Sequence, residues 1–178
     1  MRARATAFAT IAACLALTAC GGDEGPGTVE LYDRAPVPGV PDRTTAVDPT
    51  ALSPDGAYWG ELLPPSTSSR QSLTFHVIQA FFADGCVEEL GADECPNDFG
   101  TLSDPSLDVD AALTDLSSIT VVTEDRSNFA VTADELLAIS GGAAPAEEAP
   151  VGFKFARFPF LLTVRDGKIV EARQIWLP

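Results

Sequence analysis

The side chains of this chain that are suited to acid–base catalysis are its many carboxylates and one imidazole, that of His76. It is the only histidine among 178 residues, so any reaction that needs an imidazole must use it. It lies in an apolar run, and the alternation of a strand would place it on the face opposite Phe75. No G-x-S-x-G nucleophile motif accompanies it. The pattern predicts a half-exposed strand histidine and no catalytic residue, with an enzyme that uses His76 or loop carboxylates as the alternative.

Acidic residues are concentrated in the middle of the chain, where they could bind a cation. No basic residue lies between Arg70 and Arg126. Carboxylate and amide oxygens at short spacings are the ligands that calcium prefers, but the glycine and the terminal glutamate of an EF-hand loop are missing. The candidate ligands are Asp104, Asp108 and Asp110, or alternatively Asp93, Asn97 and Asp98. The sequence favours a solvated acidic loop, keeps calcium as the alternative, and predicts no cofactor.

A cysteine near the N-terminus has a different kind of chemistry. Arg2 and Arg4 precede an apolar stretch that ends in Leu17-Thr18-Ala19-Cys20. A basic start, an apolar middle and small residues before a cleavage point are the parts of a secretion signal. The tetrapeptide resembles the lipobox of bacterial lipoproteins, in which the cysteine becomes the lipid-bearing first residue.

This resemblance implies a signal peptide over residues 1–19 and a lipid on Cys20, with palmitate as a typical acyl chain. Two or more long acyl chains hold a protein almost permanently in a bilayer. The expected location is therefore the extracytoplasmic face of the cell membrane. The apolar stretch from residue 5 to 19 is shorter than the roughly 20 residues of a membrane span. An uncleaved anchor and plain secretion remain as alternatives.

The other cysteines follow from this processing. Cys14 would leave with the signal peptide and Cys20 would carry lipid, so that Cys86 and Cys95 remain. In an oxidising compartment such a pair forms a disulfide. It would close a loop of about 10 residues and stabilise the fold by about 2.5–3 kcal/mol. The spacing fits neither the C-x2-C pattern of zinc sites nor a thioredoxin-like redox motif, so the sequence predicts a Cys86–Cys95 disulfide and no metal site.

The overall charge limits the possible partners. The chain has 26 acidic and 11 basic residues, a formal charge of −15. Loss of Arg2 and Arg4 with the signal peptide would leave nine basic residues and a charge of −17. Such a surface repels nucleic acid and anionic lipid head groups. The expected partners are the membrane, through the lipid on Cys20, and an envelope protein or ligand that the sequence does not identify.

Composition divides the chain into three parts. The signal peptide over 1–19 is followed by the lipidated cysteine and a Pro/Gly-rich segment over 20–54, which predicts a flexible linker that lifts a domain off the membrane. Part of the linker near Val29–Tyr32 could still pack onto that domain. The globular domain is expected at 55–178.

Within the domain, apolar and β-branched runs predict a mainly β fold, with α+β as the variant. Strands are expected near 57–63, 72–82, 119–123, 128–131, 153–164 and 169–177. Asp166-Gly167 predicts a hairpin turn, with a bulge in the register. Thr132 and Glu135 form a predicted capping box for a short helix that ends at Gly141-Gly142. The expected architecture is an antiparallel sheet of hairpins with one or two short helices.

Several of these features together resemble a scattered group of small lipidated or secreted proteins from high-GC Gram-positive bacteria. The shared features are the lipobox, the run from Asp55 to Gly60, the run from Gln79 to Phe82, the Asp166-Gly167 turn and the closing Leu177-Pro178. The resemblance implies a β-rich domain and carries over no functional residues. The sequence thus predicts a membrane-anchored extracytoplasmic protein with a non-enzymatic binding or envelope-associated domain. An extracytoplasmic enzyme and a structural envelope protein are the alternatives.

Overall fold

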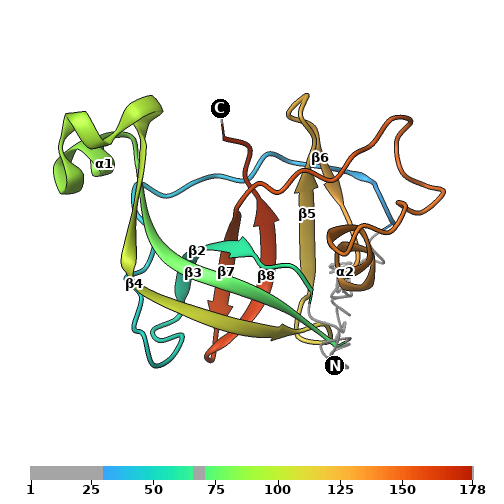
Figure 1. Ribbon diagram of the computed structural model, residues 1–178, viewed down its shortest axis with the longest axis horizontal. Coiled ribbons are helices and arrows are strands. Elements are labelled where there is room, and N and C mark those ends of the chain that lie inside the picture. The colour runs from blue at the N-terminus through green and yellow to red at the C-terminus, as the bar shows by residue number, and fades with distance from the viewer. Residues whose placement is uncertain (1–29, 66–70, 178) are drawn as a thin grey trace, which may run out of the picture.

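A computed structural model describes residues 30–65 and 71–177, and these residues form a mainly β fold built on one mixed sheet (Figure 1). The described strands follow the sheet order β1-β6-β5-β8-β7-β2-β3-β4. Their bounds are β1 Arg34–Ala35, β2 Gly56–Leu62, β3 Ser72–Phe82, β4 Phe99–Ala112, β5 Ser118–Val122, β6 Asn128–Ala130, β7 Phe160–Arg165 and β8 Lys168–Gln174. Neighbouring strands are antiparallel except β5 and β8, which are parallel. The predicted mainly β class is confirmed, and the parallel pair is an addition to the antiparallel expectation.

The hairpin between β7 and β8 has the predicted turn and the predicted bulge. Asp166 and Gly167 both have positive φ, at 51° and 71°, as a type I′ turn requires. Val164 pairs with Ile169, but Thr163 pairs with Glu171, so one residue of β8 is left out of the register. Because side chains alternate along a strand, this bulge sends Ile169 and Glu171 to opposite faces of the sheet.

The sheet curls around its inner face, which carries the larger core. Buried side chains from strands as far apart in the sheet as β3 and β6 share one cluster, including Phe75, Val121 and Phe129. The helix α2, Ala133–Ser140, adds Leu136 and Ile139 to it. A smaller cluster around Trp59 and Leu161 lies on the outer face. Tyr58 and Trp59 belong to different clusters, as their adjacency on one strand predicts.

The segment before β2 belongs to the folded domain, which corrects the expected linker over 20–54. Tyr32, Val47 and Leu52 are buried in the inner core. Residues 36–42, here called the N-terminal strap, connect β1 at one end of the sheet to a bridge between Arg43 and Phe81 of β3. Figure 1 shows this blue segment crossing the view near the arrowhead ends of β5 and β8. The prolines that suggested a linker instead fix an extended crossing, because proline restricts φ. Residues 20–29 of the expected linker lie outside the described residues.

The acidic residues in the middle of the chain lie in a helix, two short 3-10 turns and a strand. The helix α1, Ala83–Leu90, and the 3-10 turns η1, Ala92–Glu94, and η2, Pro96–Asp98, come before β4. Cys86 and Cys95 form the predicted disulfide, with an S–S distance of 2.11 Å. Asp104, Asp108 and Asp110 lie on β4, at the edge of the sheet. Throughout residues 30–65 and 71–177, no helix is long and apolar enough to span a membrane.

Candidate functional site

A pocket of about 460 Å³ lies on the outer face of the sheet, between the N-terminal strap and strands β5 and β8. Ser118 and Thr120 of β5 and Glu171 and Arg173 of β8 line it from the sheet side. Its other wall is the segment from Asp33 to Gly39, together with Glu30. The pocket is open to solvent on one side and falls within the usual volume range of small-molecule sites.

Two polar atoms in the floor of this pocket are buried and have no hydrogen-bond partner among the described residues. These are Oγ1 of Thr120 and Nε of Arg173. Thr120 is 7% exposed. The two residues are direct partners in the parallel pairing of β5 and β8, so their side chains lie next to one another on the same face. An unsatisfied buried donor or acceptor costs about 1–3 kcal/mol, which makes this pair unusual in a folded protein.

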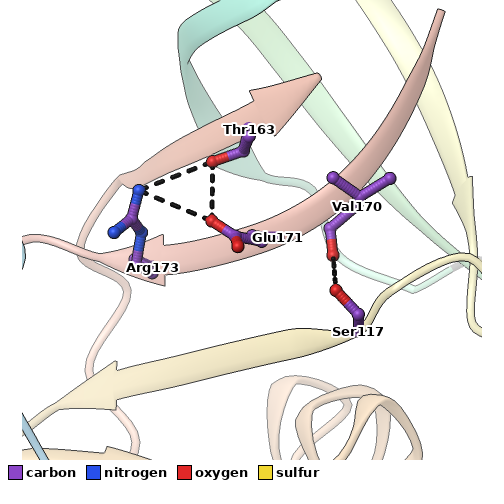
Figure 2. A network of polar contacts seen from close by, with 5 residues as sticks. All are labelled: Ser117, Thr163, Val170, Glu171 and Arg173. Carbon is purple, nitrogen blue, oxygen red and sulfur yellow. Dashed lines mark hydrogen bonds and ion pairs between the residues drawn. The ribbon is translucent and has the colours of Figure 1, made fainter. Parts of the chain in front are cut away.

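Arg173 is held by a small polar network on β7 and β8 (Figure 2). Thr163 Oγ1 donates to Glu171 Oε2 at 2.8 Å. Arg173 Nη2 lies 3.5 Å from Thr163 Oγ1 and 3.6 Å from Glu171 Oε2. Contacts of this length are weak. Among the described residues the guanidinium therefore has only weak contacts, and the side chain of Arg173 is 35% exposed.

The bulge in β8 creates this arrangement, and Ser117 supports it. The carbonyl of Val170, the extra residue, accepts a bond from the backbone N–H of Ser117 at 2.8 Å. The Ser117 hydroxyl donates to the same oxygen at 3.0 Å, as Figure 2 shows. The bulge puts Glu171 and Arg173 on the outer face beside Thr163, while Ile169 and Ala172 enter the core. Ser117 thus fixes the register that brings Arg173 opposite Thr120.

The wall of the pocket is fastened to the body of the domain at Tyr32. This residue has a positive φ of 63°, and its ring packs edge-on against Phe153. Its hydroxyl donates to Glu135 Oε1 of α2 at 2.6 Å. Burial raises the pKa of the Tyr32 hydroxyl above its usual range, and the hydrogen bond to Glu135 raises it further. The hydroxyl therefore stays protonated and keeps the segment that leads into β1 in place.

Of the two hydrogen bonds in the predicted capping box, the described residues form only the one from the backbone N–H of Glu135 to Thr132. Thr132 Oγ1 accepts from the backbone N–H of Glu135 at 3.2 Å, so the predicted N-cap is confirmed. The Glu135 carboxylate instead accepts from Tyr32 and from the backbone N–H of Ala146, at 3.0 Å. The carboxylate serves a tertiary contact, which local spacing does not reveal.

His76 lies on the outer face of β3, well away from this pocket in the sheet order. Its side chain is 35% exposed, and Nδ1 is 2.6 Å from Asp108 Oδ1 on β4. In the described hydrogen bonds no hydroxyl or thiol contacts the imidazole. Within residues 30–65 and 71–177, the histidine is therefore paired with a carboxylate and contacts no nucleophile.

The calcium candidates are not brought together. Asp108 pairs with His76, and Asp110 accepts from Thr74 Oγ1 at 2.6 Å. Among the described residues, no group of three or more His, Cys, Asp or Glu side chains could hold a metal ion. The extended strand β4 separates the three aspartates that a loop would have allowed to converge. The predicted lipidation site, Cys20, lies outside the described residues.

The sequence did not identify Thr120, Arg173 or the strap as parts of a site. It contained only part of the information needed to place them. The hairpin turn and its bulge were predictable, but the neighbour of β8 was not, because β5 ends 46 positions before β8 begins and pairs with it in parallel. No protein family, curated protein or solved structure matches this chain.

Proposed function

We propose that this protein is a lipid-anchored extracytoplasmic binding protein, and that its ligand occupies the pocket beneath the N-terminal strap. The observation that carries the proposal is the adjacent pair of buried, unpartnered polar atoms, Thr120 Oγ1 and Arg173 Nε, in the floor of that pocket. A ligand that bonds to both atoms removes the cost of leaving them unsatisfied.

The proposed location is supported by the sequence near the N-terminus. Leu17-Thr18-Ala19-Cys20 resembles a lipobox, and the basic and apolar residues before it resemble a secretion signal. The disulfide between Cys86 and Cys95 agrees with an oxidising compartment. Lipid on Cys20 would leave the folded domain outside the cytoplasm, where it meets small molecules in the envelope.

The anchor is tested by labelling the full chain with radioactive palmitate in a bacterium that processes lipoproteins. We expect label on the wild-type protein and on Cys14→Ala, which changes a cysteine that leaves with the signal peptide. We expect no label on Cys20→Ala. An unlabelled wild-type protein, or equal labelling of Cys20→Ala, would overturn the proposed anchor.

The pocket is tested by thermal unfolding of the full chain with a panel of amino acids, sugars, organic acids, amines and nucleosides. A ligand that binds only the folded state raises the Tm by mass action. We expect at least one class of compound to raise the Tm of the wild-type protein and to leave that of Thr120→Val unchanged. The proposal fails if no compound raises the Tm, or if the active compounds act equally on both proteins.

A further inference from the structure

The two unpartnered atoms in the pocket limit what a ligand must offer. Arg173 Nε–H can only donate a hydrogen bond, whereas the Thr120 hydroxyl can donate or accept. The ligand must therefore present an acceptor to Arg173. The two residues are paired across neighbouring strands, which are about 4.8 Å apart. One group with two acceptor oxygens can bridge donors at that separation.

Charge narrows the choice of acceptor. Arg173 supplies the guanidinium of this pocket, because the guanidinium of Arg34 lies 4.8 Å over the ring of Phe129, a residue of the inner core. The hydrogen bonds that a guanidinium donates to a carboxylate are shorter and stronger than those it donates to a neutral acceptor. The carboxylate of Glu171 already accepts from Thr163 and lies 3.6 Å from Arg173 Nη2. It does not satisfy Nε.

The acidic residues of the pocket limit the charge that a ligand can carry. Glu30, Asp33 and Glu171 lie around it, against the guanidinium of Arg173. The lining thus has two more negative than positive groups, and Arg173 is the one place where an anion finds a positive partner in it. A ligand with a single negative charge can bind on the guanidinium side, while a second negative charge would face carboxylates of like sign.

The remaining wall is apolar. Pro36, Val37 and Pro38 of the strap form one side, and Ala35 and Ala130 add small apolar surfaces. Val37 is 77% exposed, so its side chain is available for contact with a ligand. A ligand with an apolar body would cover part of this surface, at about 25 cal/mol per Å² of area removed from water.

From these features we infer that the pocket takes a small organic monocarboxylate with an apolar body. The carboxylate accepts from Arg173 Nε and from the Thr120 hydroxyl, and the apolar body lies against the strap. This inference rests on the proposed binding function of the same pocket. It adds the chemical class of the ligand.

Three probes of similar size separate the possible reasons for binding: hexanoate, its neutral analogue hexanamide, and the dianion adipate. Binding is measured by titration calorimetry on the lipidated full chain in detergent, with empty micelles as the blank. We expect hexanoate to bind at least tenfold more tightly than the other two, because a hydrogen bond to a charged group is worth tenfold or more.

Two variants remove the proposed contacts, and two matched variants leave them in place. Thr120→Val and Arg173→Lys should each weaken hexanoate binding at least tenfold. Thr74→Val changes a threonine on the same sheet face at β3, and Arg157→Lys changes an arginine that donates to Ser140 O elsewhere. These two should bind hexanoate within twofold of the wild-type protein. Thr120→Val keeps the shape of the side chain, so it serves as the test if Arg173→Lys fails to fold.

The outcomes distinguish the ligand class from the binding function. Equal binding of hexanoate and hexanamide, or hexanoate binding that Thr120→Val does not change, would overturn the monocarboxylate assignment. If the three probes fail but an amine, sugar or nucleoside binds and Thr120→Val abolishes that binding, the ligand class is wrong and the binding function stands. If no compound binds, both proposals are wrong.

Discussion

Two buried threonines of this protein differ in the hydrogen bonds of their hydroxyl groups. Thr120 Oγ1 has no partner among the described residues. Thr44, only 2% exposed, donates to Ala80 O at 3.2 Å and accepts from Ala80 N at 2.8 Å. A hydroxyl that serves the fold should be partnered in this way. The unpartnered state of Thr120 fits a residue kept for binding, at some expense in stability.

This contrast predicts opposite effects of one substitution. Thr120→Val should raise the free energy of unfolding by about 1 kcal/mol, because it removes an unsatisfied buried hydroxyl and adds a strand-favouring side chain. Thr44→Val should lower it by about 1–3 kcal/mol, because it leaves the backbone groups of Ala80 without the hydroxyl. Urea unfolding of both full-length variants provides the measurement. A loss of stability in Thr120→Val would show that its hydroxyl has a structural partner.

Tyr32 makes the stability of the protein fall as the pH rises through the alkaline range. Its folded-state pKa is raised above the usual value of about 10, so the unfolded chain loses this proton first as the pH rises. Stability is therefore complete below about pH 10 and falls above it, by up to 1.36 kcal/mol per pH unit. Urea unfolding between pH 8 and 11 should show a shallower decline for Tyr32→Phe than for the wild-type protein. Identical slopes would contradict this assignment.

Among the elements of the sheet, the hairpins could be predicted from the sequence, whereas the edge strand β4 could not. The turn at Asp166-Gly167 has local residue preferences that fix its geometry, and the bulge follows from keeping apolar residues on the inner face. Strand β4 has acidic residues and Pro105, which read as a loop. Yet charges and proline are usual on an edge strand, where they discourage pairing with other chains. Its order comes from pairing with β3, a tertiary effect.

The parallel pair of β5 and β8 is reinforced by one buried side chain. Gln174 is fully buried and accepts from the backbone N–H of Val122, at the end of β5, at 2.9 Å. Its amide nitrogen donates to Ala156 O and Phe158 O, at 2.7 and 2.9 Å. One residue thus joins β5, β8 and the segment that leads into β7. The floor of the pocket depends on this junction, since Thr120 and Arg173 lie next to it.

Gln174→Leu should therefore destabilise the fold despite its similar size. It removes the partner of one buried and two part-buried backbone groups, at about 1–3 kcal/mol for each group left fully unsatisfied. We expect a loss of about 3 kcal/mol in urea unfolding. The control is Gln79→Leu on β3, whose side chain makes no hydrogen bond recorded among the described residues, and which should change stability by less than about 0.5 kcal/mol. Similar losses in both variants would contradict the role of Gln174.

For the molecule as a whole, the N-terminal strap is what turns an open sheet face into a pocket. It begins at β1, which pairs with β6, and it ends beside β3, so it spans strands that are separated in the sheet order by β5, β8, β7 and β2. Composition suggests a linker here because prolines interrupt every periodic pattern. The partners of the strap lie at both ends of the sheet, and only the folded chain brings them within reach.

The strap should therefore resist proteolysis as firmly as the sheet itself. On one side of Arg43, Phe82 N donates to Asp42 O at 2.7 Å, and on the other, Thr44 N donates to Ala80 O at 2.9 Å. Trypsin needs an unpaired backbone, so cleavage after Arg43 should track global unfolding and accelerate only in urea. The bond after the exposed Lys154, in the segment before β7, should be cut in the native protein and serves as the internal control. Mass spectrometry of timed digests reports both bonds. Cleavage after Arg43 as fast as that after Lys154 would mean that the strap detaches from the folded sheet, and the pocket would then lack its wall.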